Sequence, residues 1–168
     1  MYSRMLLVTV AFVLCSLVGC GGGGKKEPSL DAQLKKAHAE TDNGRKARLL
    51  AGLGEKQLKA GDVIAGEGTL NAALEAASAV EDSASKANSL IFVGQAMGRA
   101  GKVTESKKAL REAAKSLEGV DDPGSKANAF AELGTASGTL LKNPDQAAEH
   151  LKNAENAADK IEIPAIKA

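Results

Sequence analysis

The sequence predicts an all-α protein of antiparallel helix pairs with about seven helices, and three observations support this class. Alanine, leucine, lysine and glutamate dominate from Leu30 onward, whereas aromatic residues make up only 2% of the chain, a composition that favours helices over strands. The same segment aligns with itself at an offset of about 40 residues, as helical repeats do. Glycine, proline and aspartate recur between the predicted helices, where they end one helix and begin the next.

The first element is a secretory signal peptide at residues 1–19. Arg4 supplies the positive charge at its start, and Met5 to Val18 is mostly apolar, which is the order of regions in such a signal. The apolar run is shorter than the roughly 20 residues that a membrane-crossing helix needs, and a glycine tract follows it. We therefore predict a cleaved signal rather than a transmembrane anchor.

The end of this segment carries a short motif. Leu17, Val18, Gly19 and Cys20 follow the order aliphatic, small or aliphatic, glycine, cysteine. This run resembles the lipobox of bacterial lipoproteins. The resemblance implies a diacylglycerol thioether on the Cys20 sulfur, cleavage before Cys20 and acylation of the new amino terminus, and two or more acyl chains hold a protein durably on a bilayer. The alternative is an ordinary cleaved signal in which Cys20 is incidental.

The residues around the motif bear on location and on thiol chemistry. Gly21 is not acidic, and by resemblance to enterobacterial sorting this implies the outer membrane. We therefore expect a lipid-anchored protein of the bacterial cell envelope that faces the periplasm, with the lipid bilayer as a partner. Loss of the signal also removes Cys15, so a lipidated Cys20 leaves no thiol for a disulfide or for thiolate catalysis.

A tether and a capping helix follow. Residues 20–29 are rich in glycine and charge and cannot bury apolar area, which predicts a flexible Gly-rich linker. Leu30, Leu34 and Ala37 then lie on one helical face and predict a helix over residues 30–41. This helix matches the second helix of an incomplete unit, and we expect it to cap one end of the repeat domain, which spans residues 30–168.

The repeats lie at about residues 44–82, 84–122 and 124–163, and each contains two helices. Glycine recurs at the same place in their first helices, at Gly54, Gly94 and Gly134. A glycine inside a helix costs about 1 kcal/mol relative to alanine, so its recurrence predicts that the two helices of each pair approach closely there. The third unit carries one extra residue before its second helix.

Turn residues mark the ends of these helices. Gly61 and Gly101 suit the left-handed residue past the end of a first helix. Asp62 suits the N-cap of the helix that follows. Asn143 and Asp122 each precede a proline, which suits the first position of a helix.

The apolar and small residues of the repeats occur at fixed places. In the second unit these are Leu90, Val93, Gly94, Ser106, Leu110 and Ala113; the others supply Leu50, Leu53, Gly54, Gly66, Leu70 and Ala73, and Phe130, Leu133, Gly134, Ala147, Leu151 and Ala154. This order resembles tetratricopeptide-like helical repeats over residues 45–161. The resemblance implies a short right-handed solenoid. The family's usual period is 34 residues and its aromatic positions are aliphatic here, so another helical-hairpin family with similar packing stays as an alternative.

The chemistry of the chain argues against an enzyme. His38 and His150 lie far apart, without further ligands at metal-binding spacing. The glycine tract lacks the strand and the Gly-Lys-Ser/Thr that a phosphate loop needs. Once Arg4 is removed, 21 basic residues balance 21 acidic residues, which disfavours nucleic acid. We therefore expect no catalysis, no metal, no cofactor and no nucleic-acid partner.

Binding is the activity that the resemblance implies, on the concave surface formed by the first helices. The expected partner-binding residues there are Arg48, Glu55, Asn88, Ile91, Gln95, Arg99, Asn128 and Thr135. They include no aromatic anchor, so we expect weak or extended-peptide binding. The function predicted is a membrane-anchored, non-catalytic protein–protein interaction scaffold for an unidentified envelope protein or peptide. The alternatives are an assembly accessory that acts by self-association and a solvated helix face without a partner.

Overall fold

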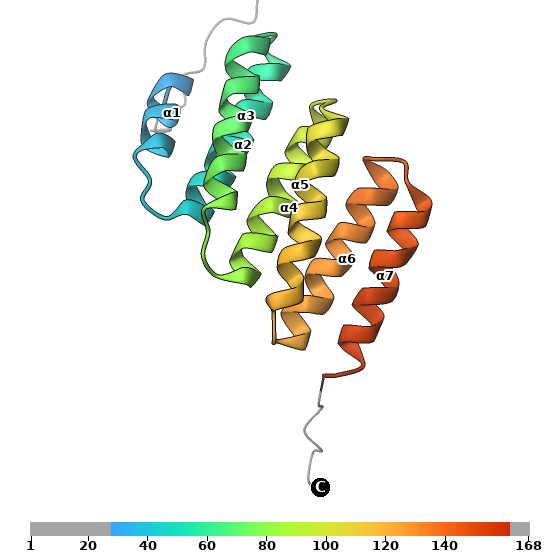
Figure 1. Cartoon of the computed structure of the whole chain (residues 1–168). Coiled ribbons are helices and arrows are strands. Elements are labelled where there is room, and N and C mark those ends of the chain that lie inside the picture. Colours follow the sequence, from blue (N-terminus) through green and yellow to red (C-terminus); the bar gives the residue numbers. More distant parts are fainter. Residues whose placement is uncertain (1–27, 162–168) are drawn as a thin grey trace, which may run out of the picture.

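The computed structural model describes residues 28–161, where all regular structure is helical (Figure 1). That range contains seven α-helices, one short 3₁₀ turn and no strand, which confirms the predicted all-α class and helix number. The elements are α1 (Leu30–His38), α2 (Asn43–Lys59), α3 (Val63–Ser78), α4 (Ser83–Arg99), α5 (Val103–Ser116), η1 (Leu117–Gly119), α6 (Pro123–Thr139) and α7 (Pro144–Ala158). The predicted signal peptide and Cys20 lie outside the described residues. Within residues 28–161, every helix is too short or too polar to cross a membrane.

Aspartates cap the first helix of every pair. The side chains of Asp42, Asp82 and Asp122 accept hydrogen bonds from the backbone N–H three residues later, at 2.6, 2.8 and 2.6 Å. The pKa of Asp82 is lowered chiefly by the Ser85 backbone N–H, and that of Asp122 chiefly by hydrogen bonding from the Ser125 side chain, because these bonds favour the charged carboxylate. Each unit therefore begins with the same local signal, an aspartate N-cap.

The turns inside the helix pairs follow the predicted chemistry. Gly61 and Gly101 adopt the left-handed conformation, with φ of 88° and 78°. Asp62 and Asn143 cap α3 and α7 through side-chain hydrogen bonds to backbone N–H groups. In the third pair, which has the extra residue, Lys142 takes the left-handed place, with φ of 52°. A non-glycine residue there carries strain that the other two turns avoid.

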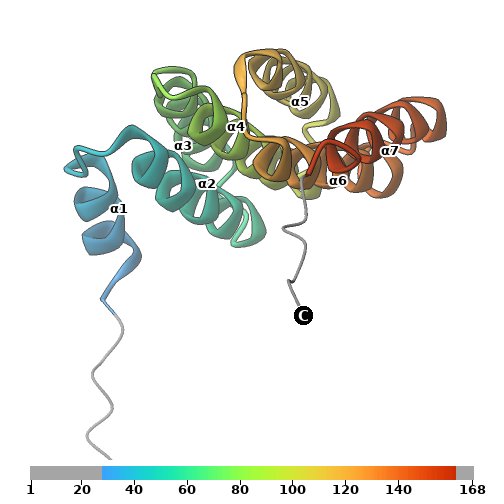
Figure 2. The same ribbon diagram turned by 90° about the horizontal axis from the view of Figure 1, so that it is seen from below.

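Three helical hairpins stack side by side, with α1 at the N-terminal end (Figure 1). The two helices of each hairpin pack along one another, and α2, α4 and α6 also pack in succession. Figure 2 shows these three helices on the inner side of a shallow arch, with α3 and α5 on its outer side. The first helices therefore form a continuous inner face.

The recurring glycines lie where the two helices of each hairpin cross. A Cβ added at Gly94 would lie 2.9 Å from the Leu110 side chain, closer than side-chain carbons come to one another. The aligned positions behave alike, with Gly54 against Leu70 and Gly134 against Leu151. The predicted close approach is confirmed. It allows a core of small and medium side chains, among which Leu50, Leu90 and Leu133 are fully buried.

The two junctions between hairpins differ. At the first junction α3 packs on α4, whereas at the second α5 has little contact with α6. Phe130 of α6 stands where α4 has Leu90, and its ring stacks on His150 of α7 with the centroids 6.2 Å apart. A groove of about 780 Å³ opens beside this pair, between α5 and α7.

Candidate functional site

A groove of about 410 Å³ crosses the inner face of the arch. It is lined by residues of three helices: Arg48 from α2, Asn88, Phe92 and Gln95 from α4, and Ser125, Asn128, Ala129 and Glu132 from α6. A smaller hollow of about 270 Å³ lies at the helix starts and shares Arg48 and Asn88 with it. The fold thus brings four of the eight predicted partner-binding residues into one groove.

Helical spacing explains which side chains reach this groove. Asn88, Phe92, Gln95 and Arg99 follow one another at intervals of three or four residues, so they form one stripe along α4. Asn128 is the aligned residue of Asn88 one repeat later, and both side chains are exposed. The repeat therefore places an amide at the same height on neighbouring helices.

Ile91 does not belong to this surface, and its prediction as a partner-binding residue is wrong. It is 0% exposed and packs in the hydrophobic core. The reason is rotational, because the residue three positions after Asn88 lies on a covered side of α4, while the one four positions after it faces the groove. Phe92 holds that second place and is 37% exposed. The groove consequently contains an aromatic side chain, although the sequence predicted none there.

Glu55 and Arg99 lie together and bind one another. The Arg99 guanidinium donates from Nε and Nη2 to the two Glu55 carboxylate oxygens at 3.0–3.2 Å, and Lys59 Nζ donates to Glu55 Oε1 at 2.8 Å. The hydrogen bond from Arg99 is the main cause that lowers the pKa of Glu55; burial opposes it, and Lys59 adds to the lowering. These two predicted residues join α2 to α4 rather than offering free charges to a partner.

Thr135 is exposed on α6 but is not among the residues that line the groove. Its hydroxyl donates to the Ala131 carbonyl oxygen at 3.0 Å, one turn earlier in the same helix. Such a local bond occupies the hydroxyl donor. Of the eight predicted residues, Arg48, Asn88, Gln95 and Asn128 are therefore the ones that line the groove.

The groove offers amide donors and acceptors between one cation and one carboxylate, Arg48 and Glu132, around an aromatic ring. These groups suit hydrogen bonding to an extended peptide. No protein-family model, curated protein or solved structure matches this chain. Among residues 28–161, no three His, Cys, Asp or Glu side chains gather closely enough to hold a metal ion.

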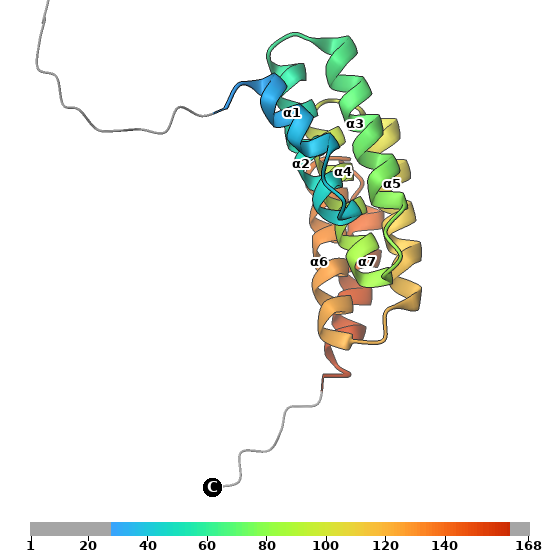
Figure 3. The ribbon, with the colours of Figure 1, turned by 90° about the vertical axis from the view of Figure 1, so that its left-hand side faces the viewer.

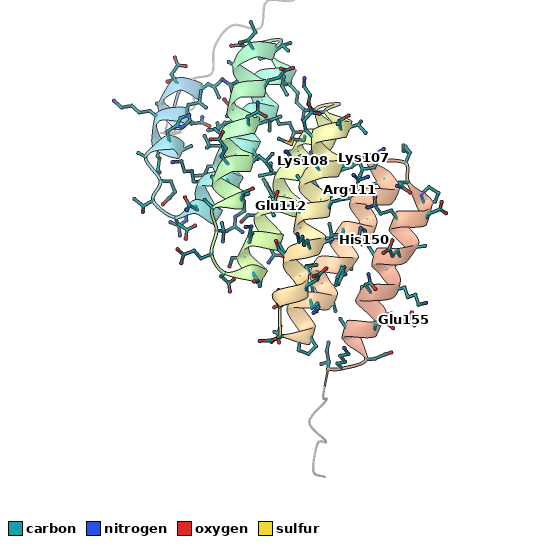
Figure 4. The ribbon with its side chains drawn as sticks, in the orientation of Figure 1. Lys107, Lys108, Arg111, Glu112, His150 and Glu155 are labelled. Atoms are coloured by element: carbon teal, nitrogen blue, oxygen red, sulfur yellow. The ribbon has the colours of Figure 1, made fainter. Side chains whose placement is uncertain are left out.

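The groove between α5 and α7 is a second concavity, which the sequence prediction missed. Figure 4 shows Arg111 on α5 and His150 on α7, and both line it, together with Lys115, Glu149 and others. Neither ring nitrogen of buried His150 has a hydrogen-bond partner within the described part of the chain. Burial lowers the pKa of His150, and the charge of Glu149 opposes that shift. Charges of both signs line the groove, so it indicates no single class of ligand.

Proposed function

We propose that this protein is a non-catalytic helical-repeat scaffold that binds an envelope protein, through an extended segment, in the groove across α2, α4 and α6. The observation that carries the proposal is the convergence of Arg48, Asn88, Gln95 and Asn128 around Phe92 from three separate helices. Amide side chains pair with peptide N–H and C=O groups, since each has donors and an acceptor. A half-exposed aromatic ring supplies the anchor that interfaces favour.

The proposal includes the architecture and the anchor. The stack is a tetratricopeptide-like, right-handed solenoid, supported by the recurring glycines, caps and hairpins. It rides on the outer membrane through acylated Cys20, supported by the lipobox-like run that ends there. A fully extended chain spans about 3.5 Å per residue, so the segment from Cys20 to Leu30 would hold the start of the first helix within about 35 Å of the anchor.

The groove is tested by affinity purification of the tagged full chain from detergent-solubilised native membranes, with quantitative mass spectrometry. The double variant Asn88→Ala/Asn128→Ala should lose a distinct protein that the wild type retains. The matched control is Asn71→Ala, which removes an exposed asparagine from α3 on the outer side. Equal retention by all three proteins would overturn the proposed groove. Arg99 is left unchanged because its loss would also free Glu55.

The anchor is tested separately. The Cys20→Ser variant should lose incorporation of a fatty-acid probe and move from the membrane fraction to the soluble fraction. Identical labelling and fractionation of the two proteins would contradict lipidation. Concentration-dependent homo-oligomers in sedimentation, with no co-purifying protein, would instead support the assembly accessory.

A further inference from the structure

A third groove, of about 620 Å³, lies between α1 and α2 at the N-terminal end of the stack. Leu49, Gly52, Leu53 and Ala37 line its apolar part. Figure 3, in which this end faces the viewer, shows α1 lying beside α2. The volume falls in the range of about 300–1,000 Å³ that is usual for ligand sites.

The groove coincides with the place of a missing helix. By the repeat of about 40 residues, α1 aligns with the second half of α3, so Leu30 corresponds to Leu70 and Ala37 to Ala77. In the complete units, the first helix of one hairpin packs on the first helix of the next, as α2 does on α4. Residues 28–161 supply no such helix in front of α2.

The aligned side chains of α4 show what that helix would cover. Ser89, Val93 and Ala96 are buried, and a Cβ added at Gly44 of α2 would lie 3.2 Å from Ser89 Oγ, so this stripe faces α2. The corresponding stripe of α2 is Leu49, Leu53 and Lys56. Leu53 is buried, whereas Leu49 is 40% exposed and Lys56 is exposed. Part of a surface that is interior in the second hairpin is therefore open in the first.

Gly52 leaves the groove open at its place on α2. It lies in the interior of α2, where glycine costs about 1 kcal/mol, and a Cβ added there would meet no atom within 4 Å. Close packing, which explains Gly54 two residues later, does not explain it. The aligned residues are Phe92 and Glu132, so only the first hairpin leaves this place empty. A missing side chain at this position lets another helix backbone approach closely.

The rim of the groove is basic. It carries four cations, Lys36 of α1 and Arg45, Arg48 and Lys56 of α2, and a single carboxylate, Glu40. Arg45 Nη1 lies 3.7 Å from Glu40 Oε2, and among the described residues no carboxylate lies within 4 Å of the other three cations. An occupant with acidic residues beside its apolar face would complement this rim.

We propose that the groove between α1 and α2 binds an amphipathic α-helix of a partner protein, which takes the place of the missing first helix. Its apolar side lies on Leu49 and Gly52, above the buried Leu53, and its acidic residues face Lys36 and Lys56. This is helix-in-groove recognition. It is separate from the inner-face groove, although Arg48 lines both.

The test uses the full chain in detergent micelles and a labelled peptide of about 17 residues, the length of α2. The peptide has leucines along one helical face, glutamates beside them and alanine elsewhere. Fluorescence anisotropy should show binding that weakens with salt, and a peptide with lysine for glutamate should bind at least about tenfold more weakly. The proposal would be overturned if the glutamate and lysine peptides bound equally. It would also be overturned if a glutamate peptide with a central proline, which breaks the helix, bound as tightly as the original glutamate peptide.

A variant that fills the groove tests the site most strictly. Gly52→Phe installs the aligned residue of α4 and should weaken the glutamate peptide at least about tenfold without lowering the melting temperature, because the space is open. Gly68→Phe is the matched control, since this glycine of α3 also has nothing within 4 Å but lies outside the groove. Unchanged affinity in Gly52→Phe would refute the site.

Two further variants separate the interpretations. Lys36→Glu/Lys56→Glu should reverse the preference toward the lysine peptide, whereas Asn128→Ala should bind the glutamate peptide as the wild type does. Loss of peptide binding in Asn128→Ala would place the helix in the inner-face groove and contradict the proposal. Sedimentation that shows self-association abolished by Gly52→Phe would make a second copy the occupant and overturn a partner protein.

Discussion

The first junction between hairpins is closed and the second is open. At the first, α3 lies against α4, while at the second α5 stands away from α6 and leaves the groove that contains His150. The repeat pattern is the same in both, but Leu117, Phe130 and His150 stand where the preceding copies have Ala77, Leu90 and Ala109. The change in packing between neighbouring units thus coincides with a few larger side chains, while caps and crossing glycines recur in each hairpin.

The largest effect should come from truncating the buried side chain at the end of the second hairpin. Leu117→Ala should lower the free energy of unfolding by about 3 kcal/mol, because it removes buried methyl groups and leaves a cavity. The mirror change, Ala77→Leu, should cost about 1–3 kcal/mol by overpacking the closed junction. Urea denaturation measures both. A neutral Ala77→Leu would mean that the first junction has room and that side-chain size does not distinguish the two.

The crossing glycines should respond unequally. Gly94→Ala should destabilise by about 1–3 kcal/mol, since the new Cβ meets buried Leu110 at 2.9 Å. Gly134→Ala should cost less, because its neighbour Leu151 is 50% exposed and can move, and alanine favours the helix. The Ala147 carbonyl oxygen, 3.2 Å from the new Cβ, keeps some of the cost. Thermal melting of the two variants compares them. Equal losses would show that the last hairpin is as tightly packed as the middle one.

The strained turn of the third hairpin offers a smaller gain. Lys142→Gly should stabilise by about 1 kcal/mol, because glycine adopts the left-handed conformation without the Cβ penalty. Lys152→Gly, inside α7, is the opposite control and should destabilise by about 1 kcal/mol. The two midpoints in urea should move in opposite directions. A loss of stability in Lys142→Gly would show that the lysine side chain, not the backbone, determines this turn.

The smallest effect on stability is expected from lowering the pH, through His150 at the open junction. The pKa of His150 is lowered by burial from its ordinary value of 6.5, so below that pH the unfolded chain takes up a proton that the folded chain binds less readily. Stability should therefore fall as the pH drops from about 7.5 to about 5. The caps at Asp82 and Asp122 lose their contribution only at lower pH, as the pH falls through their lowered pKa. His150→Leu should flatten the decline between pH 7.5 and 5, and an unchanged profile would contradict a buried neutral ring.

The sequence predicted what depends on local chemistry. The N-caps at Asp62, Asp122 and Asn143 and the left-handed Gly61 and Gly101 follow from the preferences of single residues and neighbours, and the structure confirms them. The close approach at the crossing glycines was also predictable. Glycine inside a helix lowers stability, so its recurrence at the same place in three units indicated that the helices pack closely there.

The sequence could not predict what depends on rotation and on the spacing of helices. Buried Ile91 and exposed Phe92 are neighbours in the sequence. Only the packing of the helices determines which of the two faces the core and which faces the groove. The pairing of Glu55 with Arg99 joins residues 44 positions apart and required the distance between α2 and α4. The open groove at His150 lies at a junction where a few side chains depart in size from the repeat pattern, and the pattern alone does not show such departures.

Binding through the inner face is tested most directly by photo-crosslinking in native membranes, with a photoreactive phenylalanine at position 92 in the inner groove. Ile64, almost fully exposed on α3, is the control position on the outer side. A discrete protein adduct at position 92 that is absent at position 64 is the predicted result. Adducts of equal size and yield at both positions, or at position 64 alone, would contradict binding through the inner face.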